Sequence, residues 1–390
     1  MKKIKVILIS HASVSVYMKG QKSLKQMILD DWYSLTAQQI KKFYPNIEVE
    51  CWTPERSYKN PQQFVYSEIN YRQFPTIFSP IYGLDLSVKM LSELKKEIKK
   101  SQKSGYKLIF HLHEYHNLHG LIIATIFKNQ KIIGQHHGGS WPIKHLRYSK
   151  SKRYFLPLFL LAQVWENIVL KNIKCFYALS PQEIDYLKKK APSSKIKFQT
   201  MGIDDFYFYT ADKDKVRRKL GWSKNKKIVL FLGRLIPVKG LNYLLDAMEK
   251  LKDVELKIIG WGERENFEDY AKSKKLKNVE FLGAFFGKEK LPYLSASDIF
   301  ILPSLKEGAS VSVMEAMARN LPIITTDVSG MPLMVKNNRE GIVIRQKNSE
   351  DIVRSVQKIL NWEKRNIKKY AKRYKWKKII EDTVEDYKRI

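Results

Sequence analysis

Two glutamates in one short stretch have the clearest potential for binding chemistry in this sequence. Glu307 and Glu315 lie in KEGASVSVMEAMA, residues 306–318, with seven residues between them. In the run VSVMEAMA only Ser312 and Glu315 are polar, and a segment that is apolar on all sides is typical of a buried helix. An ionised carboxylate is rarely buried without a partner, so the sequence predicts a hydrogen-bonding partner for Glu315. A diol fits, because it donates two hydrogen bonds to a carboxylate that keeps its charge.

The residues just before this helix predict room for a ligand. Glu307 and Gly308 should lie in a loop between a strand and the helix, and Ala309 and Ser310 should begin the helix. Small side chains there leave space against the amides of Ser310 and Val311, which have no partner inside the first helical turn.

A basic loop with two glycines follows another apolar run. GRLIPVKG, residues 233–240, comes after KIVLFL and before the helical pattern LNYLLDAMEKL. Gly233 permits close backbone approach, Arg234 presents a planar fork of donors, and Lys239 adds a compact charge. With the amides of the helix that begins after Gly240, these groups suit a diphosphate. The alternative is a basic loop without function in a lysine-rich chain, and the Walker pattern GxxxxGK[ST] is absent.

All eight histidines lie in the first 145 residues, and six of them fall in two short segments. HLHEYHNLH (111–119) and QHHGG (135–139) each follow an apolar run, so they should line the mouth of the same cleft. A metal site is one interpretation, but HEYH is one residue short of HExxH and the spacing fits no common zinc motif. We therefore expect no metal. For His111, His116 and His119, the simpler interpretation is that each satisfies local backbone groups.

The elements that must position these residues alternate regularly along the chain. Short apolar runs separated by longer amphipathic stretches are typical of parallel sheets with crossover helices. In the first half the predicted strands are KVILIS, IEVECW, KLIFHLH, KIIGQHH, CFYALS and KFQTMG. In the second half they are KIVLFLG, ELKIIGWG, VEFLGA, IFILPS, PIITTD and GIVIRQ. The alternation occurs twice, around the polar segment 204–227, and predicts two Rossmann-like domains that meet near residue 205.

Length and composition fit a globular protein with two cores. The chain has 390 residues, 44% of them hydrophobic, and a net charge of +32. This charge would attract nucleotides, nucleic acid or an anionic membrane surface, unless it only reflects a lysine-rich surface. Two cysteines without a spacing motif fit a reducing compartment, and we expect the protein in the cytoplasm. The apolar start is too short for a signal peptide, and no stretch is long enough to span a bilayer.

The two loops together match the pattern of a known enzyme family. GRLIPVKG followed by PSLKEGASVSVMEAMA resembles the donor-site signature of retaining GT-B glycosyltransferases of family 4, the glycosyl transferases group 1. The two glutamates match the E-x7-E motif of this family. Further similarities occur in the family's order: FYALSPQEIDYLKK, MGID, IIGWGERE, FLGAFFGKEKLPYLSASDIFILPS and TTDVSGMPLMVKNNREGIVI. The resemblance covers nearly all of residues 105–390 and implies an α/β protein with two Rossmann-like doubly wound domains facing a central cleft.

The resemblance also implies domain limits and an activity. Residues 1–205 would bind the acceptor, residues 206–370 would bind the nucleotide sugar, and residues 371–390 would form a helix crossing back to the first domain. The enzyme would move a hexose from a UDP-, GDP- or ADP-sugar to a hydroxyl acceptor with retention of the anomeric configuration. It would need no metal or other cofactor, because the departing phosphate can accept the acceptor's proton.

Donor-site roles follow from the resemblance by position. Arg234 and Lys239 would bind the diphosphate, Glu307 would bind the hydroxyls of the transferred sugar, and these three are catalytic candidates. Glu315 would hold the ribose hydroxyls. The remaining donor-binding candidates are Gly233, Ser310 and Val311 near the diphosphate, and Gly283, Ala284 and Phe285 near the base. The family often has an aromatic residue and Gly at positions 309 and 310, where this chain has Ala and Ser, so the choice of sugar stays open.

The resemblance also implies roles for the histidine segments, which align with the part of the family's sequence that faces the acceptor. His137 aligns with a histidine placed to touch the transferred sugar or the acceptor, which makes it the fourth catalytic candidate. His113 and Glu114 align with a strand end that faces the acceptor, and Gly138 adjoins His137 on the same side.

Two other kinds of protein would account for some of these sequence features: a GT-B enzyme that does not transfer the sugar, and a protein that binds nucleic acid. A GT-B enzyme with the same donor site that catalyses hydrolysis, phosphorolysis or epimerisation would give free sugar or an epimer instead of transfer. A basic nucleic-acid-binding protein would show exposed aromatic residues among basic residues along one face, but here the positive charge is spread along the chain. We expect no nucleic-acid partner.

A basic run joins an apolar, aromatic segment in residues 144–171. Such a segment suits an interfacial helix that docks on anionic lipid, close to a lipid-linked acceptor or a growing glycan. The protein would then lie peripherally on the inner face of the cell membrane. The alternative is an ordinary helix that packs against the sheet and carries solvated basic residues.

Overall fold

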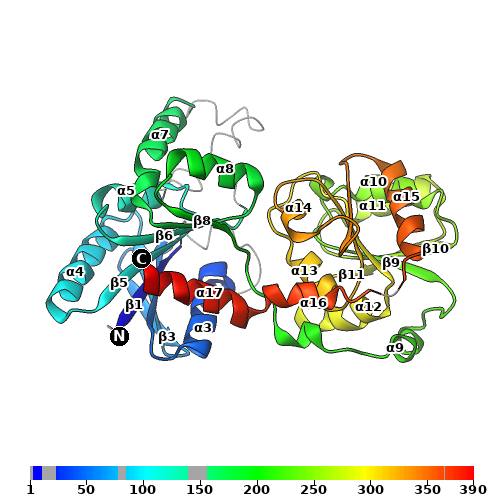
Figure 1. Cartoon of the computed structure of the whole chain (residues 1–390), viewed down its shortest axis with the longest axis horizontal. Helices are drawn as coiled ribbons and strands as arrows, with labels where there is room; N and C mark the ends of the chain where they lie inside the picture. The colour runs from blue at the N-terminus through cyan, green and yellow to red at the C-terminus, as the bar shows by residue number, and fades with distance from the viewer. Residues whose placement is uncertain (1–2, 11–22, 78–84, 139–155, 364) are drawn as a thin grey trace. The chain divides into compact units, whose positions relative to one another are not determined.

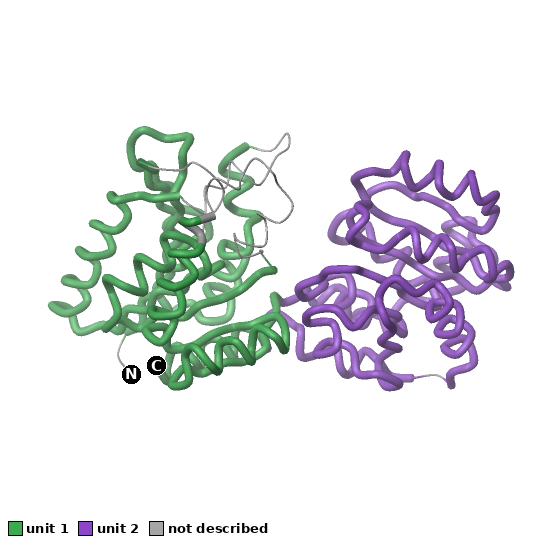
Figure 2. The backbone as a smooth tube through the Cα atoms, turned by 90° about the horizontal axis from the view of Figure 1, so that it is seen from above, with its two compact units in different colours: residues 1–201, 379–390 green, residues 202–378 purple. Residues whose placement is uncertain are grey.

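The part of the chain that the computed structural model describes comprises residues 3–10, 23–77, 85–138, 156–363 and 365–390. These residues form two compact units, which Figure 2 colours separately. Unit 1 comprises Met1–Met201 together with Ile379–Ile390, and unit 2 comprises Gly202–Lys378. Each unit has its own sheet and its own buried core.

Unit 1 is built on an eight-stranded sheet with the order β3-β4-β2-β1-β5-β6-β7-β8. Its strands are β1 (Ile4–Ile9), β2 (Glu48–Glu55), β3 (Gln62–Tyr66), β4 (Ile69–Pro75), β5 (Lys107–His113), β6 (Lys131–Gln135), β7 (Cys175–Ala178) and β8 (Lys195–Phe198). Neighbouring strands pair in parallel except β3 and β4, which pair antiparallel at the edge. Strands β1 and β5 are buried along almost their whole length, as expected of a parallel sheet covered on both faces.

The hairpin of β3 and β4 is the part of this sheet that the apolar runs did not predict. The residues of β3 are exposed or half-buried, so the strand lacks the apolar run typical of a buried strand. Ser67 and Glu68 join the strands with positive φ angles of 49° and 59°, as a two-residue hairpin turn requires. Neither is the glycine or asparagine that usually marks such a turn, so the sequence gives little sign of the hairpin.

The helices of unit 1 connect successive strands and pack around the sheet (Figure 1). Their bounds are α2 (Leu24–Asp30), α3 (Trp32–Phe43), α4 (Val88–Ser104), α5 (Leu118–Ile126), α7 (Leu156–Val169), η2 (Leu170–Asn172) and α8 (Pro181–Lys190). Ser87, Asn117 and Ser180 cap α4, α5 and α8, because each side chain accepts a hydrogen bond from a backbone amide three residues along.

The last helix, α17 (Trp376–Arg389), is fixed to the sheet of unit 1 by buried polar contacts. Its residues from Ile379 onward belong to this unit. Asp386 accepts hydrogen bonds from the hydroxyl of Tyr177 at 3.0 Å and from the ammonium of Lys195 at 2.5 Å. The hydroxyl of Tyr387 lies 2.7 Å from Nδ1 of His111. The end of the chain is therefore part of the fold of unit 1.

Unit 2 is built on a six-stranded sheet with the order β11-β10-β9-β12-β13-β14, in which all neighbours pair in parallel. Its strands are β9 (Lys227–Leu232), β10 (Val254–Ile259), β11 (Val279–Gly283), β12 (Ile299–Leu302), β13 (Ile323–Thr326) and β14 (Gly341–Ile344). The chain proceeds outward from β9 to β11 and then returns to β12 on the other side of β9. The strand order therefore reverses between β9 and β12, where open α/β sheets bind ligands.

The helices of unit 2 include several short ones at strand ends. Their bounds are η3 (Asp205–Phe208), α9 (Lys213–Leu220), η4 (Pro237–Lys239), α10 (Leu241–Met248), α11 (Arg264–Ser273), η5 (Gly287–Lys290), α12 (Leu291–Ala296), α13 (Val311–Ala318), α14 (Met331–Met334), α15 (Ser349–Leu360), α16 (Lys368–Ala371) and η6 (Lys372–Tyr374).

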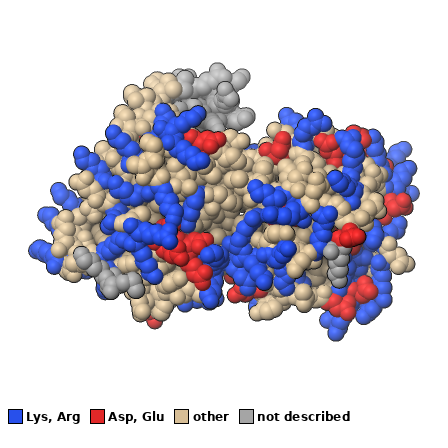
Figure 3. Space-filling model, viewed as in Figure 1, with Lys and Arg blue, Asp and Glu red and all other residues tan. Residues whose placement is uncertain are grey.

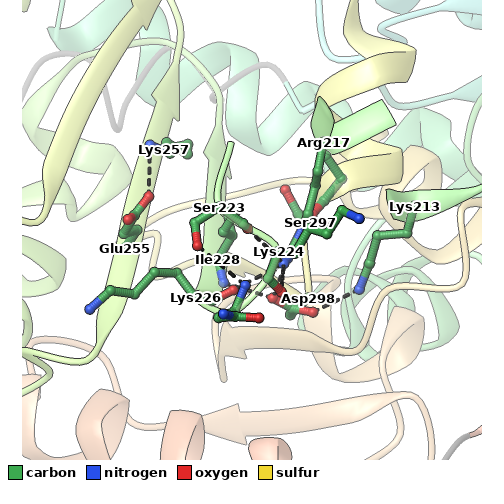
Figure 4. A network of polar contacts seen from close by, with 12 residues as sticks. Lys213, Arg217, Ser223, Lys224, Lys226, Ile228, Glu255, Lys257, Ser297 and Asp298 are labelled. Atoms are coloured by element: carbon green, nitrogen blue, oxygen red, sulfur yellow. Dashed lines mark hydrogen bonds and ion pairs between the residues drawn. The ribbon is translucent and has the colours of Figure 1, made fainter. Parts of the chain in front are cut away.

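A network of ion pairs and hydrogen bonds joins α9 to the sheet of unit 2 (Figure 4). Asp298 accepts hydrogen bonds at 2.7 Å from Lys213, from Arg217 and from the backbone amide of Ile228. The other guanidinium nitrogens of Arg217 donate to the carbonyls of Ser223, Lys224, Lys226 and Ala296. Burial alone would raise the pKa of Asp298, but Lys213, the Ile228 amide and Arg217 hold it below its ordinary value. One carboxylate thus connects α9, β9 and the start of β12.

The predicted α/β class with two Rossmann-like doubly wound domains is confirmed. Each apolar run that predicted a strand overlaps a strand of the structure. None of the described helices combines the length and apolar character that a membrane crossing requires.

Candidate active site

The candidate donor residues of unit 2 gather where β9 and β12 end, at the reversal of the strand order. The loop 233–240 follows β9, and the loop 303–310 follows β12. The backbone amide of Leu305 donates to the carbonyl of Val238 at 2.8 Å, so the two loops are in direct contact. The structure therefore brings the two predicted loop motifs together at one edge of one sheet.

Gly240 makes this close contact possible. Its φ angle is +70°, in the left-handed region, and it directly precedes α10. A Cβ atom at this position would lie 2.0 Å from the carbonyl oxygen of Pro303, far inside the distance of any ordinary contact. Glycine alone meets both conditions without a shift of the backbone. The last residue of GRLIPVKG is thus required by the packing of the two loops.

Lys239 and Glu307, one from each loop, form an ion pair between Nζ and Oε2. The same carboxylate oxygen accepts a hydrogen bond from the hydroxyl of Ser304 at 3.1 Å. Both side chains are mostly buried, with exposed fractions of 13% for Lys239 and 12% for Glu307. The sequence predicted both residues at this site but did not predict that they pair with each other.

Arg234 differs from Lys239 in being exposed. Within the described part of the chain, its guanidinium takes part in no hydrogen bond or ion pair. The amide of the preceding Gly233 donates to the carbonyl of Ile259 at 3.0 Å, which fixes the start of the loop against β10. Arg234 is therefore an accessible cation on an anchored turn.

The start of α13 presents polarised backbone amides to the same edge. Ser310 is the N-cap residue, and its hydroxyl oxygen accepts a hydrogen bond from the amide of Val313 at 3.4 Å. The hydroxyls of Ser310 and Ser312 are 3.0 Å apart. The amides of a first helical turn have no acceptor within the helix and carry a partial positive charge. Ser310 and Val311 thus lie where an anionic group would be stabilised.

Glu315 lies inside α13 and is 3% exposed. Its Oε1 accepts a hydrogen bond from the ammonium of Lys290 at the end of η5. Its Oε2 is buried as well and has no hydrogen bond of ordinary geometry among the described residues. Burial raises the pKa of Glu315, and Lys290 and the hydroxyl of Tyr207 offset part of this rise. Oε1 of Glu315 thus has a protein partner, Lys290, that the sequence did not identify. Oε2 can still accept a hydrogen bond from a ligand.

Gly283, Ala284 and Phe285 lie at the end of β11, two strands away from β9. The carbonyl of Gly283 accepts a hydrogen bond from the amide of Gly260 at 2.8 Å. The ring of Phe285 stacks on the ring of Tyr293, with centroids 4.6 Å apart. Because parallel strands end at the same edge, these residues share the edge on which the two loops lie.

In unit 1, the four predicted acceptor-side residues lie together. Strands β5 and β6 are neighbours, so their ends bring His113 and Glu114 beside His137 and Gly138. Nδ1 of His113 and Nε2 of His137 are 2.7 Å apart, a hydrogen-bond distance. Oε1 of Glu114 accepts a hydrogen bond from the amide of His137 at 2.8 Å. Glu114 has a φ angle of +60°, an unusual conformation that is more common at functional sites than elsewhere.

Three other histidines of the same segments contact distant parts of the chain. His119 accepts a hydrogen bond at Nε2 from a backbone amide at the start of α4, at 2.8 Å. Nδ1 of His111 contacts the hydroxyl of Tyr387, and Nδ1 of His116 lies 3.3 Å from Oε2 of Glu166. Burial lowers the pKa of His111 to about 3 and that of His119 to about 4. His119 thus satisfies a backbone amide that is distant in the sequence, and His111 and His116 each contact a side chain far along the chain.

The basic run 144–155 of the predicted membrane-binding segment lies outside the described residues. The remainder of the segment forms α7 and η2. On α7, the side chains of Leu160, Leu161, Val164 and Ile168 are all more than half exposed. Leu160, Val164 and Ile168 follow one another at intervals of four residues, and Leu161 lies beside Leu160, so the four side chains form an apolar stripe on one side of the helix.

Sequence comparison relates parts of the chain to known proteins. Residues 212–375 match the sequence model of the family described as glycosyl transferases group 1. An uncharacterized glycosyltransferase of Methanocaldococcus jannaschii is 31% identical over 213 residues. This alignment covers 50% of this chain and 55% of that relative, so the chain matches about half of the relative's length.

Solved structures resemble the whole chain. Sucrose-phosphate synthase from Thermosynechococcus elongatus has a TM-score of 0.70 at 19% identity, and the match covers 99% of this chain and 98% of that one. Anabaena HepE in complex with UDP has a TM-score of 0.69 at 16% identity, with coverages of 99% and 100%. At such identities the likeness concerns the fold alone, and it confirms the predicted GT-B fold.

Proposed function

We propose that this protein is a retaining glycosyltransferase of family 4, which moves a sugar from a nucleotide-diphosphate sugar to a hydroxyl acceptor. The observation that carries the proposal is the meeting of the Lys239–Glu307 pair with the start of α13 where β9 and β12 end. The match of residues 212–375 to the group 1 family and the GT-B fold support sugar transfer.

In this proposal, the loops of unit 2 bind the diphosphate of the donor. Arg234 contributes an exposed fork of donors, and Lys239 contributes an ammonium held in place by Glu307. The amides of Ser310 and Val311 add donors at the positive end of α13. Gly233 has no side chain, so a ligand can approach the backbone directly after β9.

The two glutamates bind different hydroxyl groups of the donor. Glu315 accepts hydrogen bonds from the ribose diol, which its unused Oε2 supports. Glu307 binds hydroxyls of the transferred sugar, next to the diphosphate held by Lys239. Main-chain groups of Gly283, Ala284 and Phe285 contact the base. Anabaena HepE binds UDP, so a uracil nucleotide is the first candidate for this donor.

The reaction breaks the bond between the anomeric carbon and the diphosphate oxygen. A bond from the same carbon to the acceptor oxygen forms on the same face of the sugar, which retains the configuration. Negative charge grows on the departing phosphate, and Arg234, Lys239 and the helix amides stabilise it. That phosphate accepts the proton of the acceptor hydroxyl, so neither a carboxylate base nor a metal is needed for this step.

Unit 1 binds the acceptor in this proposal. His137 contacts the transferred sugar or the acceptor hydroxyl, and its ring is held by Nδ1 of His113 at 2.7 Å. Glu114 fixes the backbone of His137 and, with Gly138, shapes the surface that the acceptor meets.

We further propose that the acceptor is lipid-linked or part of a growing glycan and is reached at the inner face of the cell membrane. The exposed stripe of α7 supplies apolar anchors, and the net charge of +32 favours anionic lipid. Figure 3 shows Lys and Arg side chains spread over the face in view, with acidic side chains among them. Flotation with anionic vesicles, but not with neutral ones, is the expected outcome, and Leu161→Ser with Val164→Ser should reduce it.

Thermal-shift measurements with UDP, GDP, ADP and their sugars test the donor site, because a bound nucleotide raises stability by mass action. The best donor is then incubated with sugar and lipid-linked acceptors, and NMR reports the anomeric configuration of the product. Transfer with retention is expected. Free sugar or an epimer without transfer would favour another nucleotide-sugar reaction, and no shift with any nucleotide would contradict the donor site.

A further inference from the structure

Three side chains beside the proposed acceptor residues meet in unit 1: His116, His136 and Glu183. One potential ligand atom of each lies within 4.8 Å of the corresponding atoms of the other two. The three residues follow β5, β6 and β7, which are neighbours in the sheet, so the topology gathers them at one edge. Two imidazoles and a carboxylate are ligands that zinc takes readily in proteins.

Two of the three candidate ligands have a further partner that would hold them in place. Nδ1 of His116 lies 3.3 Å from Oε2 of Glu166, whose side chain is 1% exposed. A histidine that a carboxylate holds at one nitrogen is oriented to present the other nitrogen to a metal. The hydroxyl of Tyr115 donates to Oε1 of Glu183 at 2.8 Å, which orients that carboxylate in the same manner. Outer partners of this kind are typical of metal centres in proteins.

His136 lies between two carboxylates. Its Nδ1 is 2.8 Å from Oε2 of Glu183, and its Nε2 is 3.7 Å from Oε2 of Glu114. Oε2 of Glu183 also accepts a hydrogen bond from the amide of Leu179 at 2.9 Å. Two ligand atoms that each lie about 2.0–2.2 Å from a tetrahedral zinc ion are about 3.3 Å from each other. Binding of zinc would therefore lengthen the distance between Nδ1 of His136 and Oε2 of Glu183, now 2.8 Å, by roughly 0.5 Å.

The exposure of the three side chains is intermediate, at 17% for His116, 16% for His136 and 9% for Glu183. The site is therefore shielded enough to strengthen the attraction between a cation and a carboxylate, yet open enough to admit an ion and water. The side chain of Glu166, which contacts His116, is almost fully buried, so it can hold the imidazole in a fixed orientation.

We propose that His116, His136 and Glu183 bind one divalent transition-metal ion of the zinc class. Water would complete the coordination, as in zinc sites with three protein ligands. The proposal concerns unit 1 alone and does not rest on the proposed function, whose leaving-group chemistry needs no metal. It revises the expectation of no metal that followed from the histidine spacing.

The spacing failed to indicate this site because its ligands come from three strand ends. Within HEYH, His113 contacts His137, and only His116 belongs to the proposed site. The second ligand follows the next strand, and the third lies 47 positions after His136. Such a set has no fixed spacing in the sequence.

Hydrogen bonding without metal is the competing explanation of the same distances. In that case Nδ1 of His136 donates to Glu183, and Nδ1 of His116 donates to Glu166. The two explanations differ in one measurable property, which is the stoichiometric uptake of metal.

The experiment measures zinc binding to the untagged, full-length protein after metal has been removed with a chelator. Calorimetric titration and elemental analysis after dialysis should give one zinc ion per chain, and Co²⁺ in its place should give the visible absorption of a low-coordinate site. His116→Ala and His136→Ala should each weaken binding by about 100-fold or more. Glu166→Gln should weaken it by about 10- to 100-fold, because it removes an outer partner and keeps all three ligands.

His119→Gln removes a described histidine of the same segment that is outside the proposed set and keeps an acceptor for the amide of Ser87, so it is the matched control and should bind zinc like the wild type. Circular dichroism and thermal unfolding without metal show whether each variant is folded. Glu183→Gln replaces the third proposed ligand with a side chain of the same shape. A wild-type protein that takes up no stoichiometric zinc would overturn the proposal. Folded His116→Ala and His136→Ala variants with wild-type affinity would overturn it equally.

Discussion

The ammonium of Lys239 donates a hydrogen bond to a carboxylate oxygen of Glu307, and this ion pair joins the two loops of the proposed donor site. Each charge thus has a partner before any ligand binds. An ammonium has three donors, so Lys239 can contact a phosphate oxygen without releasing Glu307. The second oxygen of Glu307 can still accept from a sugar hydroxyl. The pair therefore sets the spacing between diphosphate and sugar in the proposed complex.

Lys239→Ala should lower kcat/KM for transfer by about 100-fold or more, since losing one donor to the developing charge typically costs about 3 kcal/mol. The measurement is donor-dependent transfer by variants whose folding is checked by circular dichroism. Lys252→Ala, at an exposed lysine of the same unit, is the control and should keep wild-type turnover. The double variant Lys239→Ala/Glu307→Gln separates the lost phosphate contact from an unpaired carboxylate. Wild-type turnover by Lys239→Ala would refute the role of this residue.

Glu315→Gln should change how stability depends on pH. Burial raises the folded-state pKa of Glu315 above its ordinary value of 4.5. Folding then favours the protonated form, so this contribution to the free energy of unfolding is complete below pH 4.5 and is lost as pH rises through the raised pKa. Glutamine does not titrate, so the stability of the wild type minus that of the variant should fall as pH rises. Urea unfolding across this range measures the difference, and a constant value would contradict the prediction.

The buried strands and the position of the two loops could be predicted because of how a parallel sheet is built. A strand covered on both faces needs a continuous apolar run, and β9 and β12 are such runs. Parallel strands end at one edge, so polar residues directly after two such runs should meet there. Arg234, Lys239 and Glu307 were found on that basis.

Pairings between distant side chains could not be predicted in this way. Lys290 lies 25 positions from Glu315, and in a chain with 71 Lys and Arg residues no local pattern distinguishes it. Glu183 looks like part of a helix start after Ser180, and only the pairing of β6 with β7 brings it to His136. Such contacts depend on the sheet order, which periodicity does not contain.

Gly240→Ala should destabilise the protein far more than Gly221→Ala, although the two φ angles are +70° and +68°. A methyl group at 221 meets no atom within 4 Å, so only the left-handed strain of about 1–2 kcal/mol is expected. At 240 the methyl group would lie 2.0 Å from the carbonyl oxygen of Pro303, so the backbone must move. Urea unfolding should show at least about twice the loss for Gly240→Ala, together with weaker nucleotide binding. Equal losses would contradict the close packing of the loops.

Acidification from pH 7.5 to pH 5 should destabilise the protein through two buried histidines. The folded-state pKa is about 3 for His111 and about 4 for His119, against an ordinary value of 6.5. Because both values are depressed, the stability that these groups contribute is complete above pH 6.5 and is lost as pH falls toward the folded-state values. At pH 5 each group should have lost about 2 kcal/mol, at about 1.4 kcal/mol for each pH unit below 6.5.

Neutral replacements test this account of the acid sensitivity. Gln at position 119 keeps an acceptor for the amide of Ser87 but cannot gain a proton in this range. His119→Gln and His111→Gln should therefore each reduce the loss of unfolding free energy between pH 7.5 and 5 by about 2 kcal/mol, even if each lowers stability at pH 7.5. Urea unfolding at the two pH values isolates the pH-dependent part from any packing defect. If the double variant lost as much stability on acidification as the wild type, other groups would control the acid response, and the burial of these imidazoles would not explain it.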